Sequence, residues 1–539
     1  MKKTIYVVLI VFLSMMLIFV PIGCGKKKSK SPDRTLNIIS GSENEQLEPI
    51  MQKFAEKEKF ALNIRYMGSV DIMLELEKAD IEADAVLPAN SIWIALGDEK
   101  QKRVKNSESI MRSPVVLGVK KSIAKRLKWI GKAVTVQDIL KASEAGEIRM
   151  ISTSATQSNS GAAAYIGYLY AFAGNPQMLT MKHLQDPEVA NNIKLMLGNV
   201  DRSAGSSGWL KSLFIEKYDQ YDAMVNYESM IIEANRELIT SGKEPLYAIY
   251  PVNGLAIADS PLGYIDKGNQ KKLELFSKLQ EHLLSSEIQD EIQKLGRRTG
   301  LVGMDISIAN RDVFNQDWGI DTRKVISPIR FPSANVIRES LRLYQTAFRK
   351  PSFTVYAIDF SGSMEGDGEK QLKDAMRILL DPNESSRYML QPSPNDVTYI
   401  LPFNHQIINE YNSIGNDSSK LRSLLMQVNR LSAAGGTDIY MPVMRAFEIF
   451  KNNKDQLENY FPAVILMTDG KSNDDKSNLQ DLQTFIGNLG FNWDIPAFCI
   501  TFGEADKSQL DAIAQYTSGR VFDGTQDLIG AFRHAKGYN

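Results

Sequence analysis

The chain has 539 residues, of which 43% are hydrophobic and 24% charged, and its formal net charge is −1. This length favours two to four domains, because a single hydrophobic core stops growing at about 250–300 residues. The composition is that of ordinary globular proteins and excludes a largely disordered chain or one with many membrane spans. The balance of 63 basic and 64 acidic side chains gives no basic excess, so we expect no nucleic-acid partner.

The first 24 residues have the features of a targeting segment. Two lysines near the start are followed by an apolar run from Ile5 to Ile22, and Gly23 precedes Cys24. This pattern resembles a bacterial lipoprotein signal peptide, which implies that Cys24 is lipidated and becomes the mature N-terminus. Pro21 departs from that family, which usually has leucine at this position. The alternative is an uncleaved anchor helix, since about 18 apolar residues can span a bilayer. Both interpretations place the chain at the extracytoplasmic face of the cell membrane.

Residues 25–33 are predicted to be a basic tether containing four lysines. These lysines can contact anionic lipid headgroups, at about 1 kcal/mol per basic residue, or the segment can be a solvated spacer. The second cysteine, Cys499, lies in the apolar run Ile495–Ile500. If Cys24 is acylated, Cys499 has no partner, so we expect a buried thiol and no disulfide.

Residues 34–301 alternate short apolar segments with amphipathic helical segments. Predicted strands include Leu36–Ser40, Asn63–Met67 and Ala85–Leu87, and predicted helices include Gln46–Lys59 and Leu273–Leu295. The alternation predicts parallel sheets with helices on both faces. Residues 302–351 are rich in Asn, Asp and Pro and are predicted to be a connector with one helix, Ser333–Phe348, that Ser333 can cap.

Residues 352–539 resume the strand–helix alternation with more strongly apolar strands. The predicted strands are Phe353–Ile358, Val397–Phe403, Ala463–Met467 and Ala497–Thr501. Helices are predicted near 370–380, 419–431, 440–451, 478–489 and 507–516. Continuous apolar runs suit strands buried on both faces. We therefore expect an α/β fold with a doubly wound, Rossmann-like domain here, whose ligands bind at the carboxyl ends of the strands.

Oxygen-bearing side chains follow two of these strands. Asp359, Ser361 and Ser363 come directly after the first strand, with Gly362 allowing a tight turn between the serines. Thr437 follows two glycines at the start of a helix, and Asp469 follows the strand Ala463–Met467. Carboxylate and hydroxyl oxygens suit Mg²⁺ or Mn²⁺, which keep part of their hydration shell. The alternative is that the aspartates and Thr437 only cap helices.

Together these three segments resemble the von Willebrand factor A family and its metal-ion-dependent adhesion site, over the whole of 352–539. The resemblance implies that Ser361, Ser363 and Thr437 ligate Mg²⁺ or Mn²⁺ directly. Asp359 and Asp469 would then act through bound water and hydrogen bonds. The metal would keep residual positive charge and one open position, which a Glu or Asp of a protein partner can fill.

Residues 34–301 are similar to the extracellular solute-binding proteins of ABC transporters, two-lobed proteins that close on a ligand. The segments that carry this resemblance are Ser40-Gly41-Ser42, Ser158–Gly161 and Val225–Glu228, with Val115–Val119 and Ala248–Pro251 as crossings between lobes. The resemblance implies a periplasmic-binding-protein-like fold that holds a small polar or anionic solute at Ser40, Ser42, Ser160 and Tyr227. The alternatives are that the serines are helix caps and that Tyr227 is a core aromatic residue.

The leading hypothesis is a lipid-anchored binding protein, not an enzyme, that binds a solute and engages a protein partner through its metal site. An ABC permease or another envelope protein would be that partner. One alternative is a metal-dependent hydrolase, for which a general base is required and His405 is the candidate. Another is an adhesion protein whose first domain is a ligand-free spacer.

Overall fold

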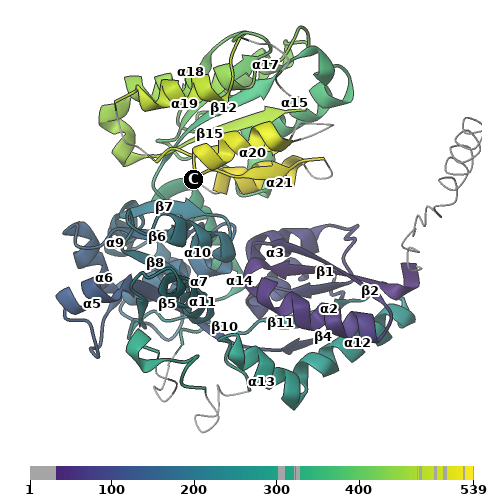
Figure 1. The fold of residues 1–539 in the computed structure, drawn as a ribbon, viewed down its shortest axis with the longest axis vertical. Coiled ribbons are helices and arrows are strands. Elements are labelled where there is room, and N and C mark those ends of the chain that lie inside the picture. Colours follow the sequence, from purple (N-terminus) through teal and green to yellow (C-terminus); the bar gives the residue numbers. More distant parts are fainter. Residues whose placement is uncertain are drawn as a thin grey trace, which may run out of the picture.

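The computed structural model describes residues 32–300, 310–320, 322, 328–469, 472, 476–490, 494–501, 507–525 and 528–537. The predicted signal peptide, Cys24 and nearly all of the basic tether lie outside these residues. Across the described residues, no helix is both long and apolar enough to cross a membrane. Figure 1 shows two lobes side by side, with a second domain placed above them.

The first lobe is built on a five-stranded sheet in the order β2-β1-β3-β11-β4. Strands β1 (Thr35–Gly41), β2 (Ala61–Met67) and β3 (Ala85–Leu87) run parallel, whereas β11 (Pro261–Ile265) is antiparallel to β3 and to β4 (Val104–Ser109). The short helix η2 (Ser42–Leu47) follows β1 directly. The other helices of this lobe are α2 (Glu48–Lys57), α3 (Ser69–Glu77), α4 (Ser91–Gly97), α12 (Gln270–Leu284) and α13 (Ser286–Lys294).

The second lobe has a sheet in the order β10-β5-β8-β6-β7, with β9 also paired to β5. Its strands are β5 (Ser113–Lys120), β6 (Met150–Thr153), β7 (Val200–Ala204), β8 (Ala223–Tyr227), β9 (Leu246–Ile249) and β10 (Ile257–Ala258). Its helices are α5 (Lys121–Arg126), α6 (Val136–Glu144), α7 (Asn159–Phe172), α8 (Met181–Leu184), α9 (Pro187–Gly198), α10 (Ser207–Glu216) and α11 (Glu228–Thr240).

The sheets of the first domain are mixed, which corrects the expectation of parallel sheets. The chain crosses from the first lobe to the second between β4 and β5, and returns between β10 and β11. A strand that enters a lobe from the opposite lobe is antiparallel to its neighbours. Strand β5 is therefore antiparallel to β8, β9 and β10. The predicted crossing at Ala248–Pro251 comes too early, because this segment overlaps β9, which lies wholly in the second lobe.

The single helix predicted over Leu273–Leu295 is two helices, α12 and α13. Ser285 between them is extended, with φ −65° and ψ 147°. Apolar residues from both helices pack into one core: Phe276, Leu279, Leu283, Ile288 and Ile292. The apolar spacing continues across the break, which is why the pattern predicted one helix. Gly296 beyond α13 has φ +85°, as expected of a glycine at a helix C-terminus.

The segment predicted as a connector packs against both lobes. Val313, Phe314 and Trp318 join the core of the second lobe. The predicted helix is α14 (Ala334–Leu343), extended by the π-helical η4 (Tyr344–Phe348). In α14, Arg338 donates to the Leu96 carbonyl of the first lobe at 3.0 Å, and the Ser340 carbonyl accepts from Tyr165 of the second lobe at 2.9 Å. Ser333 occupies the N-cap position, but its side chain makes no capping hydrogen bond.

The second domain is doubly wound, as predicted. Its sheet has the order β14-β13-β12-β15-β16-β17, and every pair is parallel except β14 with β13. In chain order this is 3-2-1-4-5-6, in which β12 and β15 flank the point where the direction of winding reverses. The strands are β12 (Ser352–Asp359), β13 (Val397–Phe403), β14 (Tyr411–Ile414), β15 (Phe461–Thr468), β16 (Ala497–Thr501) and β17 (Val521–Asp523).

Helices cover both faces of this sheet. Tyr356 and Ile358 of β12 point into the core formed with α15 (Asp367–Leu380), α17 (Ser418–Asn429) and α21 (Leu528–Gly537). Phe353, Val355 and Ala357 point into the opposite core, formed with α18 (Tyr440–Asn452), α19 (Leu479–Gly487) and α20 (Lys507–Tyr516). This period-2 alternation is what a strand buried on both faces requires. The short helix α16 (Pro382–Arg387) precedes β13.

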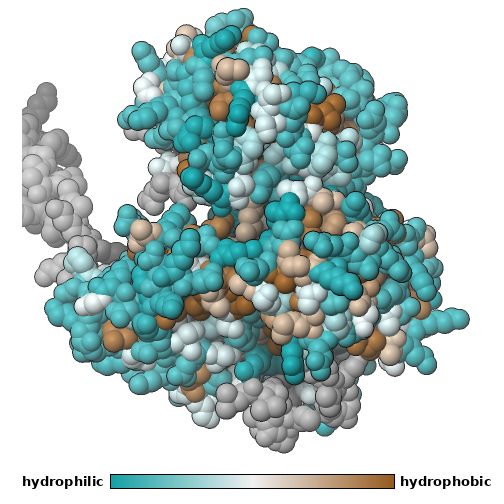
Figure 2. All heavy atoms as spheres, turned by 180° about the vertical axis from the view of Figure 1, so that it is seen from behind, coloured by the Kyte–Doolittle hydropathy of each residue, from teal (hydrophilic) through white to brown (hydrophobic). Residues whose placement is uncertain are grey.

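The second domain rests on both lobes through the amino-terminal edge of its sheet, here called the docked edge. Arg533 in the last half of α21 pairs with Asp71 of the first lobe and donates to the Thr156 carbonyl of the second lobe. Arg202 of β7 pairs with Asp494, which precedes β16, and donates to the Ser518 carbonyl, which precedes β17. Figure 1 shows α21 facing the lobes, and Figure 2 shows the surface narrowing between the two domains.

Candidate functional site

Two aspartates stand at the carboxyl ends of neighbouring strands in the second domain. Asp359 is the last residue of β12, and Asp469 follows the last residue of β15. Asp359 is fully buried, and its carboxylate accepts hydrogen bonds from the Ser361 amide and the Thr468 hydroxyl, both at 2.7 Å. Burial raises the pKa of Asp359 to about 6, although the hydrogen bonds from Thr468 and Ser361 oppose the rise. The carboxylate is therefore held in one orientation behind the loop that follows β12.

A chain of oxygen atoms leads from this loop to the second aspartate. The Ser361 and Ser363 hydroxyls lie 3.2 Å apart, and the Ser363 hydroxyl donates to Asp469 at 2.9 Å. Ser361 is buried, Ser363 is exposed and Asp469 is half-buried. Three side-chain oxygens from two strand ends therefore meet at the surface, as the sequence predicted.

The glycine loop that carries Thr437 runs alongside this cluster. The Gly362 amide donates to the Gly435 carbonyl at 2.9 Å, and the Ala434 amide donates to the Phe360 carbonyl at 2.8 Å. Gly435 adopts φ +84°, a conformation that favours glycine. Thr437 is buried two residues further on. The amides of Tyr440 and Met441 at the start of α18 donate to the carboxylate of Asp438, at 3.0 and 3.1 Å. Helix capping is thus supplied by Asp438, next to Thr437.

The donor set at this edge fits a hard divalent cation. Hydroxyl and carboxylate oxygens are the ligands that Mg²⁺ and Mn²⁺ take, together with water. Within the part of the chain that the structure describes, no group of three or more His, Cys, Asp or Glu side chains is arranged to hold a metal. The serine hydroxyls are therefore an essential part of what this site offers to an ion.

His405, the general base considered for a hydrolase, packs against the glycine loop. A Cβ on Gly435 would lie 2.7 Å from its Nδ1 atom, and this nitrogen is buried without a hydrogen-bond partner among the described residues. His405 itself is half-buried. His405 thus fills the space beside Gly435, whose carbonyl accepts from the Gly362 amide of the loop after β12.

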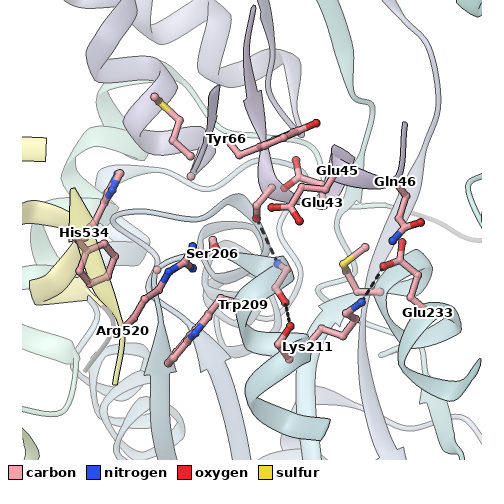
Figure 3. Close-up of a pocket in the computed structure, with 18 residues that line it drawn as sticks. Glu43, Glu45, Gln46, Tyr66, Ser206, Trp209, Lys211, Glu233, Arg520 and His534 are labelled. Atoms are coloured by element: carbon pink, nitrogen blue, oxygen red, sulfur yellow. Dashed lines mark hydrogen bonds and ion pairs between the residues drawn. The ribbon is translucent and has the colours of Figure 1, made fainter. Parts of the chain in front are cut away.

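A second candidate site is a cavity of about 310 Å³ between the two lobes (Figure 3). The first lobe contributes Ser42, Glu43 and Glu45, and the second lobe contributes Trp209, Lys211 and Glu233. The lobes touch each other around it. The Gly208 amide donates to the Ser42 hydroxyl at 3.3 Å, and the Trp93 indole donates to Asn159 at 2.7 Å. The cleft between the lobes is therefore closed.

Of the four residues predicted to hold a solute, Ser42 lines this cavity. The other three are buried and bonded to neighbouring protein groups. Ser40 accepts from Asn44 at 3.2 Å, Ser160 lies 2.7 Å from the Ser207 hydroxyl, and Tyr227 accepts from Asn159 at 3.0 Å. Ser160 lies inside α7, which begins at Asn159. Contact of Ser40, Ser160 and Tyr227 with a ligand stays a prediction.

Sequence reasoning did not select Glu43, the most unusual residue in the cavity wall. Its side chain is 7% exposed, and Oε1 has no hydrogen-bond partner among the described residues. The carboxyl group folds back over Gly41, where a Cβ would lie 2.0 Å from that oxygen. Burial raises the pKa of Glu43 to about 7. The one local sign of this burial in the sequence was the glycine two positions before Glu43. A glutamate near the start of a helix is usually solvated, so the position of Glu43 itself gave no indication.

Two protein-family models match the chain. Residues 36–298 match a model described as bacterial extracellular solute-binding protein, and residues 355–527 match the von Willebrand factor type A (VWA) domain. The chain is a bacterial extracellular solute-binding domain followed by a VWA domain. The VWA boundaries coincide with the doubly wound sheet, and the solute-binding match spans both lobes.

Individual proteins resemble parts of the chain. Inter-alpha-trypsin inhibitor heavy chain H1 of Bos taurus is 26% identical over 191 residues, and that of Mesocricetus auratus is 25% identical over 189. Each match covers 33% of this chain and 20% of the relative, so the chain spans about a fifth of these curated relatives.

Solved structures match the lobes more broadly. The sulfate-binding protein SubI from Mycobacterium tuberculosis has TM-score 0.40 and 14% identity, covering 56% of this chain and 95% of that one. A putative spermidine/putrescine ABC transporter from Listeria monocytogenes has TM-score 0.44 and 12% identity, covering 58% and 98%. The two family models carry the assignment.

Proposed function

We propose that the protein is a lipid-anchored, extracytoplasmic binding protein that holds a small solute between its lobes and captures a protein partner through a divalent cation on its VWA domain. The observation that carries the metal half is the run of oxygens from Ser361 through Ser363 to Asp469, with Asp359 fixed behind it. The solute half is supported by the cavity that both lobes of the solute-binding domain line.

The residues have distinct roles at the cation. Ser361, Ser363 and Thr437 would ligate Mg²⁺ or Mn²⁺, and Asp359 and Asp469 would hold water ligands through hydrogen bonds. When bound, the ion supplies a positive centre with an open coordination position that attracts an acidic side chain. Since Ser363 is exposed, a carboxylate of a partner protein can reach it from solvent.

The placement of the VWA domain supports this role. The solute-binding domain contacts the docked edge, where the strands begin. The metal-site residues stand at the opposite edge, where β12 and β15 end. A partner can therefore approach the cation without displacing the solute-binding domain. An ABC permease that receives the solute, or another envelope protein, is a partner of the expected kind, and a lipid on Cys24 would keep the whole chain at the membrane.

Both family models describe domains that bind rather than catalyse, and His405 packs against Gly435. The protein is therefore assigned no enzymatic activity in this proposal. The solute-binding half and the cation-binding half can be tested separately, because Ser42 and Glu43 belong to the first domain and Ser361 and Ser363 to the second.

The test is calorimetric titration of the full chain with Mg²⁺. Ser363→Ala should lose measurable binding, because it removes a ligand and its hydrogen bond to Asp469. The matched control is Ser386→Ala, an exposed serine whose hydroxyl bonds only the Asn383 carbonyl at 3.2 Å, and it should bind as wild type does. Pull-down from envelope extracts should then recover a partner with Mg²⁺ and lose it with chelator or Thr437→Ala. Equal Mg²⁺ binding by wild type and Ser363→Ala would overturn the metal assignment.

A further inference from the structure

The cavity between the lobes has a third wall, made by the VWA domain. Arg520 and Phe522 of the β17 region and His534 of α21 line it together with residues of both lobes (Figure 3). This wall is held in place by the docked edge, where Arg533 reaches both Asp71 and the Thr156 carbonyl. Both domains therefore contribute to the lining of one cavity.

The carboxylates that line the cavity outnumber its lysine and arginine side chains. Three carboxylates, Glu43, Glu45 and Glu233, face two cationic side chains, Lys211 and Arg520. Glu233 is compensated, because Lys211 lies at 3.3 Å and Arg297 at 2.6 Å from its carboxylate. Burial raises the pKa of Glu45, and the positive charge of Arg520 is the largest effect opposing that rise.

His534 is also engaged outside the cavity. Its Nε2 atom lies 3.3 Å from the Asp71 carboxylate. Lys211 lies closer to Glu237, at 2.7 Å, than to Glu233. The cation nearest to Glu43 is Arg297, which already pairs with Glu233.

Glu43 lines the cavity, with its carboxyl group packed over Gly41, and no ion pair joins this carboxyl group to another of the described residues. Arg297 approaches it, but this guanidinium donates to the Glu43 backbone carbonyl at 2.7 Å and pairs with Glu233. The Oε1 atom of Glu43 is buried and has no hydrogen-bond partner among the described residues. A carboxyl group buried in this state either takes up a proton, as its raised pKa indicates, or pairs with a charged donor that enters the cavity.

The remaining walls are aromatic. Trp209, Tyr66 and Phe522 all line the cavity. One face of Trp209 is covered by Arg202 at 5.7 Å, and Arg520 lies 5.8 Å from the centre of the Phe522 ring. Rings of this kind attract alkylated cations through their electron-rich faces and also exclude water. They suit an organic cation better than a bare inorganic ion, which would need several oxygen ligands.

We infer that this cavity is a composite site for a small organic ammonium ion, paired with Glu43 and enclosed by the VWA domain, so that ligand binding and docking of that domain stabilise each other. The inference rests on the proposed solute-binding function and narrows its ligand from a polar or anionic solute to a cation. The volume of about 310 Å³ lies at the small end of ligand pockets, which fits a compact amine. Because the ligand touches both domains, the stabilisation is reciprocal.

The first test is calorimetric titration of the full chain with choline and 1,4-diaminobutane as chloride salts, against sodium acetate and sodium sulfate at equal ionic strength. At least one cation should bind, and Glu43→Gln should weaken it by about tenfold or more, the loss expected for a charge-assisted hydrogen bond. The control Glu144→Gln changes an exposed glutamate of α6 and should leave affinity unchanged. The Glu43→Gln chain should melt no lower than wild type, because it removes a buried unpaired charge.

The second test addresses the wall from the VWA domain. Phe522→Ala should weaken binding of the same cation, whereas Tyr516→Ala, an aromatic residue of the VWA surface that is 41% exposed, should not. In wild type, the bound cation should slow hydrogen exchange in α21, and Glu43→Gln should abolish this slowing.

Four results would overturn the inference: binding by acetate or sulfate alone, no binding by any probe, equal binding by wild type and Glu43→Gln, or cation binding that leaves exchange in α21 unchanged. Mg²⁺ titration of the same variants should match wild type. Binding of an anion alone therefore refutes the cation while leaving the proposed solute-binding function standing. Loss of Mg²⁺ binding in Ser363→Ala reports on the metal site independently of either result.

Discussion

Arg533 should control whether the VWA domain stays on the lobes. Its side chain is almost fully buried, pairs with Asp71 and donates to the carbonyls of Tyr388 and Thr156. Replacing it by methionine keeps the length of the side chain but leaves Asp71 without its main counter-charge. Removing one partner of a buried ion pair costs about 3–5 kcal/mol, so the ratio of docked to undocked chains should fall by about two to four powers of ten.

Hydrogen exchange is the appropriate assay, because undocking exposes both sides of the interface. In Arg533→Met, exchange should accelerate together in α21 and in α3, which carries Asp71. The control is Arg387→Met, an arginine whose side chain is 70% exposed and pairs with Glu384 at 3.3 Å; such surface pairs contribute about 1 kcal/mol or less. Unchanged exchange in both helices of Arg533→Met would refute the argument that this ion pair holds the domains together.

The same ion pair predicts a pH dependence of docking. Burial raises the pKa of Asp71, but the charge of Arg533 and the hydrogen bond and charge of His534 outweigh it, and the net shift is downward from 3.8. An aspartate with a lowered pKa stabilises the docked state above 3.8 and stops doing so as the pH falls through its shifted value. Docking measured by exchange should therefore be independent of pH near neutrality, where Asp71 is fully ionised, and should weaken below about pH 4. In Asp71→Asn it should be weak throughout.

Further expectations concern the metal site. Gly435→Ala should destabilise the VWA domain by about 1–3 kcal/mol in thermal unfolding and weaken Mg²⁺ binding, because φ is +84° and the new Cβ would lie 2.7 Å from His405 Nδ1. Gly487→Ala, where the Cβ meets nothing within 4 Å in α19, should be neutral or stabilising by up to about 1 kcal/mol; similar losses in both variants would contradict this account. Burial raises the pKa of Asp359 to about 6, so Mg²⁺ affinity should be level above pH 7 and fall by about tenfold per pH unit below 6 as protons compete. Asp359→Asn should bind weakly without that slope, and the same slope in this variant would show that another group titrates.

Much of the VWA domain could be predicted from the sequence, because short segments of the chain indicate both its strands and its candidate metal ligands. Strands such as β12 are buried on both faces and therefore appear as continuous apolar runs. The oxygen-bearing residues directly follow these runs, at Asp359 and Asp469, so a strand end and a ligand set are visible in the same short segment. The doubly wound topology then brings the strand ends together without further information.

The first domain was harder to predict because its decisive features depend on distant segments. The directions of β5 and β11 follow from the passage of the chain between the lobes. The residues that form these strands do not indicate in which direction each strand runs. The break at Ser285 is hidden because α12 and α13 present apolar residues to the same core. Ser160 lies in a segment whose residues are typical of a ligand-binding helix start. Its hydroxyl is instead hydrogen-bonded to those of Thr153, at 2.8 Å, and Ser207, at 2.7 Å.

The residues that line the cavity were even harder to predict, because they also come from segments far apart in the sequence. Glu43 is buried beside Arg297, which lies 254 positions away in the chain and donates to its carbonyl, and a single sequence does not record such a contact. Phe522 and His534 are ordinary strand and helix residues until the docked edge places them beside Tyr66 and Trp209. Contacts between residues separated by more than 450 positions, such as Asp71 and Arg533, leave no periodic pattern in a single sequence.

The segment from α14 to β12 connects the two lobes directly to the central strand of the VWA domain. Residues 334–359 begin where Arg338 and Tyr165 tie α14 to the two lobes, pass through the π-helical turn η4, and become the central strand whose last residue is Asp359. Opening of the lobes would strain these two ties, because they join α14 to different lobes, and β12 lies between β13 and β15 at the centre of its sheet. A movement of the lobes would thus reach Asp359 through residues 349–351, the short link between η4 and β12.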